Sequence, residues 1–296
     1  MVEHDALIDA LLRHAPEHGN FSNKIGGFAI IRRDFINACE VCMVKPILLV
    51  NVQGKKRSVI GSVPYEYKAG ESLILGMDLP TGSVVLDASP EKPYCSMVME
   101  LDASLITTIL TGLPKVDIDR QNLPAVVCSK TDPAILEAFA KLVELLDTPE
   151  HIEYLAPLII REIHYRLLVS PFGEHIKAIH FAGTQSSQIA YAITWLEENY
   201  KAPLKIEALA HHVNMAGSTF HRNFKQITTL SPLQYQKKLR LFEAQRLMLT
   251  EGVDVMSASY AVGYDSPTQF NREYKRMFGN SPGKDVRAIL SITATS

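Results

Sequence analysis

Histidine is missing from a long stretch of this 296-residue chain, since none occurs between His18 and His151. Imidazole is the usual ligand for the metals of barrel-shaped enzymes, so its absence excludes a histidine-based metal centre from most of the first half. The chain also lacks a serine or cysteine nucleophile motif and a glycine-rich phosphate-binding loop. We therefore expect no metal, no other cofactor and no enzymatic activity.

Cysteine is scarce as well, and the four residues are Cys39, Cys42, Cys95 and Cys128. So few cysteines in a long chain do not make a disulfide framework, which favours a reducing cytoplasm. Cys39 and Cys42 have the spacing of a redox pair, but residues three apart on a strand point to opposite faces. We interpret the cysteines as structural. The alternative is a regulator that senses an oxidant or electrophile through Cys39 and Cys42.

Long apolar runs are absent too, because none reaches the roughly 18 residues that span a bilayer. The first residues are acidic and lack the order of a secretory signal, so we expect a cytoplasmic protein without a membrane partner. Hydrophobic residues make up 47% and charged residues 21% of the chain, which is ordinary for a soluble protein. The length favours two domains.

The formal net charge is only −2, but the charge is divided unevenly. Residues 187–296 hold 13 Lys and Arg against 9 Asp and Glu, a net of +4. This leaves 17 against 23, a net of −6, for residues 1–186. Such an asymmetry favours a nucleic-acid partner for the basic part.

Short β-rich runs separated by Gly and Pro fill the first hundred residues and predict strands. They lie at 24–31, 46–52, 58–61, 65–68, 72–77, 84–86 and 95–101. Their length and spacing indicate a small antiparallel barrel or jelly roll. Because such barrels can enclose a ligand, we expect a small organic effector to bind inside it.

Helical spacing replaces the strand pattern after Asp102. Apolar helices are predicted at 132–147 and 156–169, and they either cover the barrel or form a dimer contact. The polar segment 183–187 has the composition of a linker between domains. The expected fold class is α+β, with a β-barrel and covering helices in residues 1–186 and an all-helical domain in residues 187–296.

The helical part contains an internal repeat. Phe-His-Arg-Asn-Phe-Lys at 220–225 recurs fifty positions later as Phe-Asn-Arg-Glu-Tyr-Lys at 270–275, and a Ser-Pro pair follows each copy. A short helix and a tight connection precede both copies, at 204–215 and 255–264. This order is the helix-turn-helix, whose second helix enters the major groove of DNA.

Each second helix has a buried aromatic stripe and an outward face. The outward residues are Ser218, Thr219, His221, Arg222 and Lys225 in the first unit, and Thr268, Gln269, Asn271, Arg272 and Lys275 in the second. Arg suits guanine and Asn or Gln suits adenine, whereas Lys meets phosphates. Ser218 and Ser266 are expected to cap these helices, with Pro267 at the first helical position. A long helix at 232–249, roughly 25 Å in length, separates the two units.

These residues resemble the AraC/XylS family of bacterial transcription regulators over about a hundred C-terminal residues. The matching motifs are 218–225, 231–235, 239–241, 262–264 and 269–274. The resemblance implies two helix-turn-helix units joined by a long helix. It also implies base-facing roles for Ser218, His221 and Arg222 in the first unit, and for Pro267, Thr268, Asn271 and Arg272 in the second.

Three residues depart from the family pattern. Thr229 stands where the family usually has Gly, Ser259 replaces a small Ala, and Pro267 occupies a position that is often polar. In the first half, residues 65–73 and 78–80 resemble the cupin-like sensor of one branch of the family, although the identity of a ligand does not transfer with this likeness.

The expected function is sequence-specific transcription regulation controlled by a small-molecule effector or chemical signal. Residues 1–186 sense the effector and dimerise, and residues 187–296 bind DNA. The expected partners are double-stranded promoter DNA, the effector, RNA polymerase and a second copy in a homodimer. Two other classes stay open: an enzyme with a DNA-binding appendage, and a helical repeat that binds a protein.

Overall fold

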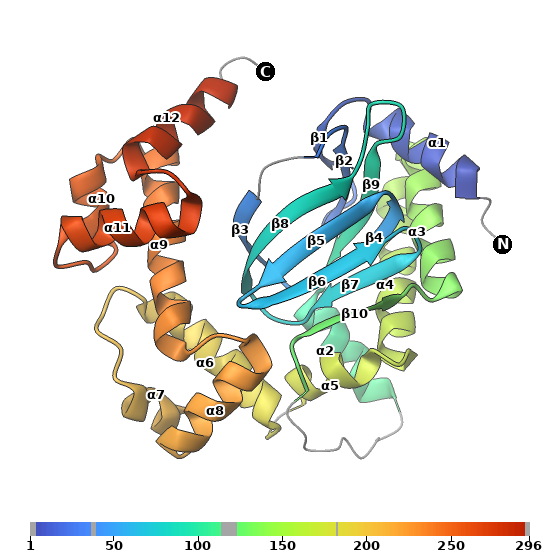
Figure 1. The fold of residues 1–296 in the computed structure, drawn as a ribbon. Helices are drawn as coiled ribbons and strands as arrows, with labels where there is room; N and C mark the ends of the chain where they lie inside the picture. Colours follow the sequence, from blue (N-terminus) through green and yellow to red (C-terminus); the bar gives the residue numbers. More distant parts are fainter. Residues whose placement is uncertain (1–3, 37–39, 114–122, 182, 294–296) are drawn as a thin grey trace. The chain divides into compact units, whose positions relative to one another are not determined.

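The computed structural model describes residues 4–36, 40–113, 123–181 and 183–293. The chain forms two compact units, one made by residues 1–40 and 44–188 and the other mainly by residues 189–296 (Figure 1). The first unit is rich in strands and the second is helical. The predicted α+β fold class is confirmed.

Two sheets form the centre of the β-rich unit. The six-stranded sheet has the order β1 (Gly19–Ser22), β2 (Phe28–Arg33), β9 (Tyr94–Glu100), β4 (Ile47–Gln53), β7 (Glu71–Leu75) and β10 (Val126–Lys130). Its neighbouring strands run antiparallel. The four-stranded sheet has the order β3 (Glu40–Val44), β8 (Leu79–Asp87), β5 (Lys55–Ile60) and β6 (Val63–Lys68). Each predicted run overlaps one of these strands, but β1, β3 and β10 were not predicted.

Helices cover the outer face of the six-stranded sheet (Figure 1). The helical segments of this unit are α1 (His4–His14), α2 (Ala103–Gly112), α3 (Pro133–Leu145), the 3₁₀ turn η1 (Pro149–His151), α4 (Ile152–Val169) and α5 (Gly173–His180). Their core joins Phe28 and Met97 of the sheet to Leu11 of α1, Phe139 of α3 and Ile163 of α4. Fully burying each such side chain stabilises the fold by about 1.5–3 kcal/mol. The two predicted apolar helices therefore cover the sheet with one face.

Neither α1 nor α5 was predicted, and the expected linker at 183–187 is mostly helical. Helix α6 (Gln185–Asn199) begins inside it, and Ser186 is buried. The hydroxyl of Thr184 accepts a hydrogen bond from the backbone N–H of Ser187 at 3.0 Å. This bond satisfies a free donor of the first turn, so a polar sequence that resembled a linker begins a helix instead.

The helical unit contains the duplicated helix-turn-helix. Its other elements are α7 (Ile206–His212), α8 (Gly217–Thr228), α9 (Pro232–Thr250), α10 (Val255–Ala261), α11 (Pro267–Phe278) and α12 (Pro282–Thr293). The first helix-turn-helix consists of α7 and α8, and the second consists of α10 and α11. Helix α9 joins the two motifs. The predicted long helix is confirmed as α9, which is about 28 Å long at 1.5 Å per residue.

The turns inside the two units share one backbone geometry. Asn214 and Gly263 each have a positive φ, of 56° and 88°, as the residue that ends a helix often does. The next residue in each turn, Met215 or Tyr264, donates its N–H back into the preceding helix, at 2.9 and 3.0 Å. A β-carbon at Gly263 would also collide with the carbonyl oxygen of Lys201, so glycine is required there on two grounds.

The capping of the second helices agrees only partly with the sequence interpretation. Ser266 caps α11 and Pro267 begins it, as predicted. Ser218 does not cap α8, because the N-cap is Ala216, whose side chain accepts no hydrogen bond. The carboxylate of Glu207 lies against Gly217 at this helix end. A negative charge there is favourable because it faces the positive end of the helix dipole.

One arginine ties the two halves of the helical unit together. Arg240 of α9 donates to the carbonyl oxygens of Tyr200 at 2.7 Å, Lys201 at 3.0 Å and Ala202 at 3.0 Å, all between α6 and α7. It also donates to the carbonyl oxygen of Gly263, in the turn of the second unit, at 2.6 Å. The turn of the second unit is thereby fixed to the segment that enters the first.

A buried carboxylate fixes α11 to α9. Glu273 accepts hydrogen bonds from Lys237 of α9 at 2.7 Å and from the hydroxyl of Tyr264 at 2.8 Å. Burial tends to raise the pKa of Glu273, but hydrogen bonds from Lys237, Gln269 and Tyr264 outweigh it and hold the pKa below its ordinary value of 4.5. The ionised form is therefore the one that stabilises the unit.

The C-terminal end of α8 contains backbone strain. Thr229 has a φ of 65°, whereas Gly279 takes the same position after α11 with a φ of 83°. A β-branched residue is disfavoured in this region.

We expect Thr229→Gly to raise the free energy of unfolding by about 0.5–1 kcal/mol. Urea unfolding followed by the fluorescence of Trp195, the only tryptophan of the chain, measures the change. Gly279→Thr is the matched control and should lower stability; a loss of stability in Thr229→Gly would refute the strain.

Glu273 also generates a pH dependence. Its pKa is lower in the folded state, so its contribution is complete above the unfolded value and is lost as the pH falls through the folded value. We expect Glu273→Gln to lose about 1–2 kcal/mol at pH 7, and this difference from the wild type should shrink as the pH falls below 4.5. Urea unfolding at several pH values tests this. Glu251→Gln, which alters an exposed pair with Arg246, is the control. If the difference in unfolding free energy between Glu273→Gln and the wild type stayed constant with pH, the lowered pKa of Glu273 would be contradicted.

Candidate DNA-binding surface

Helix α8 is oriented by an aromatic stripe. Phe220 and Phe224 are fully buried, with ring centroids 5.6 Å apart, and the ring of Tyr235 from α9 lies 5.7 Å from Phe224. Because residues four apart share a helix face, the opposite face points outward. On it, the structure places Ser218, His221, Arg222 and Lys225 as exposed residues and Thr219 as half-buried.

Helix α11 repeats this arrangement with more aromatic contacts. Phe270 and Tyr274 are fully buried, and their rings contact Tyr264 at 5.3 Å and Phe278 at 4.4 Å. Tyr274 also donates to Asp285 of α12 at 2.7 Å. The outward face carries Thr268, Gln269, Asn271, Arg272 and Lys275 as exposed residues, and Pro267 is half-buried at the first helical position.

The outward side chains differ in how free they are to meet a ligand. Within the described residues, Arg222 and Arg272 make no hydrogen bond or ion pair with another side chain. Gln269 instead donates to Glu273 at 3.2 Å, so it has to leave this partner before it reads a base. Arg222 and Arg272 are therefore the candidates for bidentate base contacts that the fold presents most directly.

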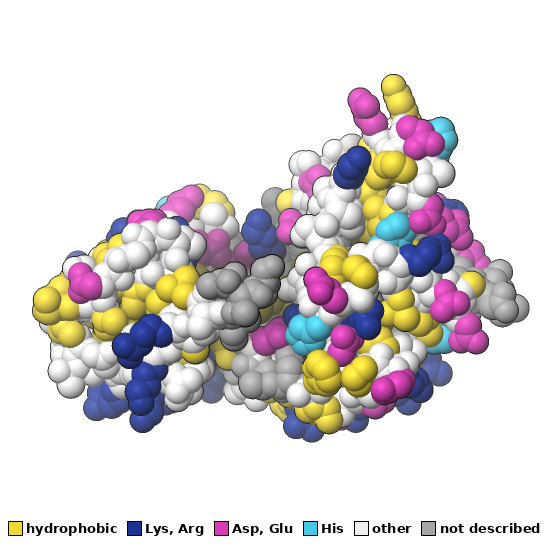
Figure 2. Space-filling model, turned by 90° about the horizontal axis from the view of Figure 1, so that it is seen from above, with side chains coloured by type: hydrophobic (Ala, Val, Ile, Leu, Met, Phe, Trp, Pro, Cys, Tyr) yellow, Lys and Arg dark blue, Asp and Glu magenta, His cyan; other side chains and the backbone are white. Residues whose placement is uncertain are grey.

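Two further basic residues, Lys275 and Arg276, follow Arg272 on α11. Figure 2 shows Lys and Arg side chains close together on the helical unit, at the left of the view. Arg276 is exposed in the last turn of α11, directly after Lys275. Arg276 was not among the residues predicted from the sequence, because the repeat has Gln226 at the equivalent position. Its charge and its spacing of four residues from Arg272 were the available signal.

The cysteines of the β-rich unit are unevenly exposed. Cys42 is exposed on β3, Cys95 is buried and Cys128 is half-buried, while Cys39 lies outside the described residues. Burial raises the pKa of Cys95 and of Cys128 to about 11 in each case. Both therefore stay protonated near neutral pH, and a protonated thiol is a poor nucleophile.

A polar cluster is buried on the strands of the β-rich unit. Ser58 of β5 makes hydrogen bonds of 2.9 Å with Tyr67 and with Ser83. From the other sheet, the ring of Tyr94 lies 5.6 Å from the ammonium group of the buried Lys56. The cluster therefore spans the interior between the two sheets.

Among the described residues, three buried polar atoms at this interior make no well-aligned hydrogen bond: the Tyr94 hydroxyl, Ser96 Oγ and Asn51 Oδ1. The side chains of Ser96 and Tyr67 lie close to the Tyr94 hydroxyl. Leaving such atoms unpaired costs about 1–3 kcal/mol each, so they favour a bound polar molecule. Among the described residues, no three His, Cys, Asp or Glu side chains gather so that they could hold a metal ion. In the same described ranges, none of the helices is long and apolar enough to cross a membrane.

Comparison with protein families gives two matches. Residues 24–175 match the N-terminus of AraC-type transcriptional regulators, and residues 209–288 match a helix-turn-helix domain. The first match spans 152 of the 296 residues, which is more than half of the chain. The second includes both α8 and α11.

Individual relatives agree with these matches. The chain is 25% identical over 163 residues to the HTH-type transcriptional activator RhaS of Escherichia coli O1:K1 / APEC, which covers 53% of this chain and 56% of RhaS. The matched part thus spans about half the length of the curated relatives.

Solved structures of ToxT from Vibrio cholerae share the fold. One, at 12% identity, has a TM-score of 0.59 and covers 88% of this chain and 97% of ToxT. Another, of ToxT with a bound unsaturated fatty acid, has 11% identity, a TM-score of 0.54 and coverage of 90% and 97%. From its two family matches and its duplicated helix-turn-helix, the chain belongs to the family of AraC-type transcriptional regulators, with a DNA-binding helical domain and an N-terminal regulatory domain.

Proposed function

We propose that this chain is a cytoplasmic, non-enzymatic transcription regulator that reads a specific promoter site with α8 and α11 and is controlled by a small molecule bound in its β-rich unit. The observation that carries the proposal is the pair of exposed arginines, Arg222 and Arg272, at equivalent positions of two duplicated helices. Neither has a side-chain partner among the described residues. RNA polymerase at the same promoter is the expected protein partner.

The residues divide into base readers and phosphate binders. Arg222 and Arg272 take guanine edges in bidentate contacts, and Asn271 takes an adenine edge. Lys225, Lys275 and Arg276 lie further along their helices and contact phosphates, which fix the register without reading sequence. A helix of about 28 Å between the readers suits successive major grooves about 34 Å apart on one DNA face.

The effector is proposed to bind between the two sheets. Tyr94, Ser96 and Asn51 each offer a buried polar atom there without a well-aligned hydrogen bond among the described residues, and Lys56 adds a positive charge. These groups suit a small organic molecule with hydroxyl, carbonyl or carboxylate groups. A ligand shifts the regulator between two states only when it binds one of them more tightly, so the effector has to bind the DNA-competent and DNA-incompetent states with different affinity.

A second copy of the chain is proposed to dock on α4. One face of this helix carries four exposed apolar residues: Tyr154 at 73%, Leu158 at 64%, Tyr165 at 47% and Val169 at 52% exposure. Their spacing of four, seven and four residues places them on one side of an 18-residue helix. An apolar stripe of this length is typical of an interaction surface, and a two-fold dimer would bury it on both copies at once.

We expect Leu158→Glu to dissociate the dimer, because it places a charge at the centre of the apolar stripe. Analytical ultracentrifugation over a concentration series measures the change, and the dissociation constant of the dimer should weaken by at least about tenfold. Val63→Glu, an exposed apolar residue on β6, is the matched control and should leave the dimer intact. A wild-type chain that stays monomeric throughout the series would remove this part of the proposal.

The two readers are tested with a library of promoter-region DNA. We expect Arg222→Ala and Arg272→Ala each to lose about 1–3 kcal/mol on the selected site, with much less effect on random DNA. Arg246→Ala is the matched control, because Arg246 is exposed in the same unit but is held by Glu243 and Glu251. Lys225→Gln should weaken all sequences alike and lower the salt dependence of binding by about one charge.

The outcomes separate the proposal from its rivals. Equal losses on selected and random DNA would assign both arginines to phosphates. If the full chain selects no site at any salt concentration, with or without candidate effectors, the helical repeat does not read DNA and a protein partner takes its place.

A further inference from the structure

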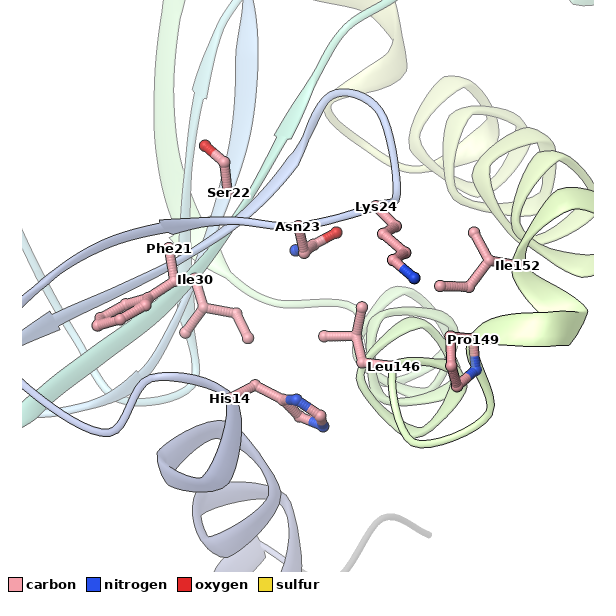
Figure 3. Close-up of a pocket in the computed structure, with 9 residues that line it drawn as sticks. All are labelled: His14, Phe21, Ser22, Asn23, Lys24, Ile30, Leu146, Pro149 and Ile152. Atoms are coloured by element: carbon pink, nitrogen blue, oxygen red, sulfur yellow. The ribbon is translucent and has the colours of Figure 1, made fainter.

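A cavity of about 330 Å³ opens on the helix side of the six-stranded sheet. It lies between the C-terminal end of α1, the β1–β2 hairpin and the junction of α3 with α4 (Figure 3). The proposed effector cluster faces the other side of this sheet, since Tyr94 and Ser96 alternate along β9 with Cys95 and Met97, which belong to the helix-side core. The two sites are therefore separate.

About half of the cavity wall is apolar. Phe21 and Ile30 come from the hairpin, and Leu146, Pro149 and Ile152 come from the α3–α4 junction. A wall of this kind binds the body of an organic molecule rather than an ion alone. At about 30 Å³ for each water-sized group in a liquid, the volume suits a ligand of about ten non-hydrogen atoms.

A single cation completes the lining. The ammonium group of Lys24 reaches into the cavity toward Leu146 and Ile152 (Figure 3), and no hydrogen bond or ion pair holds it among the described residues. The aliphatic part of the Lys24 side chain can lie along the apolar wall while its ammonium group stays accessible to a ligand.

The other polar residues of the lining are Asn23, His14 and Ser22, and Ser22 offers only a neutral hydroxyl. Asn23 accepts the N–H of Ile25 at 2.8 Å and donates to the carbonyl oxygen of Phe28 at 3.3 Å, so it shapes the hairpin loop. His14 Nε2 lies 2.9 Å from Asp147, which also pairs with Arg13 at 3.0 Å. Because Asp147 lies beside His14, Lys24 is the cation of the lining that has no acidic neighbour among the described residues.

We propose that this cavity is a second ligand site, which binds a small monocarboxylate with a compact apolar body. The carboxylate pairs with the Lys24 ammonium group, and the apolar body lies against Phe21, Ile30 and Leu146. One unpaired cation matches one negative charge, whereas a phosphate ester would bring a second charge without a partner. The apolar side of the wall favours an organic anion over a free inorganic one. The site goes beyond the proposed function, because neither DNA reading nor the cluster between the sheets uses it.

Direct binding to the full-length protein tests the site, without DNA. Isothermal titration uses hexanoate and benzoate as probes, with hexanol and benzyl alcohol as their neutral analogues, up to about 10 mM, because ligands of this size bind weakly. We expect saturable binding of a carboxylate that weakens at least about tenfold in Lys24→Met and for the neutral analogue. Lys92→Met, at another exposed lysine of the same unit, is the matched control and should bind as the wild type does.

A second variant tests the apolar wall. Leu146→Phe places a larger side chain in the cavity, so it should also weaken binding. Thermal unfolding of each variant shows that it is folded. Three results would overturn the site: no binding of either carboxylate to the wild type, equal affinity in Lys24→Met, or equal affinity for the neutral analogue. Selection of a DNA site by the wild type is measured separately, so a failed cavity and a failed DNA reader are distinguishable.

Discussion

The geometry of the helical domain depends on the guanidinium group of Arg240. It gathers carbonyl oxygens from two distant stretches, Tyr200 to Ala202 and Gly263, and each of them lies at a helix end where the intrahelical pattern offers no donor. Gln236, one turn earlier on α9, donates to the carbonyl oxygens of Tyr200 and Ala202 as well. Because the planar guanidinium presents several donors in fixed directions, the entry to the first reader and the turn of the second are held at one relative position.

Other polar contacts keep the second reader on this frame. Glu273 connects α11 to Lys237 of α9 and to the turn residue Tyr264. Asp285 of α12 accepts hydrogen bonds from Tyr274 and Gln245. These bonds fix the side of α11 that faces the core, and the charged side chains of its outer face need no intramolecular partner. A rigid inner face with a free outer face is what preorganised recognition requires.

The sequence predicted the helical domain almost completely, because its information is local and repeated. Aromatic residues at 220, 224, 270 and 274 determine which face of each second helix is buried, and spacing alone assigns Arg222 and Arg272 to the outside. The hydrogen bonds of Arg240 could not be predicted, because its partners are backbone carbonyls 23 to 40 residues away. Such carbonyls carry no residue-specific pattern. The cap of α8 was mispredicted for a related reason: Ser218 has the right chemistry, but the chain enters the helix two residues earlier.

The β-rich domain was predicted less completely. Alternation and turn residues located β2, β4 and β5 to β9, but β1, β3 and β10 were missed. Strands β1 and β10 are short edge strands of their sheet. The pairing order joins strands far apart in sequence, such as β2 with β9, and is not set by local propensity. The cavity beside Lys24 arises where a helix end, a hairpin and a helix junction meet, so no single segment encodes it.

The two readers of one chain are not copies of each other. The first turn places Asn214 in the left-handed region two residues before its N-cap, whereas the second has one more residue, Asp265, between Gly263 and Ser266. The outward faces differ as well, with His221 in one and Asn271 in the other. A DNA sequence that matches both helices therefore has a polarity. If α8 and α11 read DNA as proposed, inverting the site would place each helix on the half-site that the other recognises. A single chain would then define an upstream and a downstream direction on the double helix.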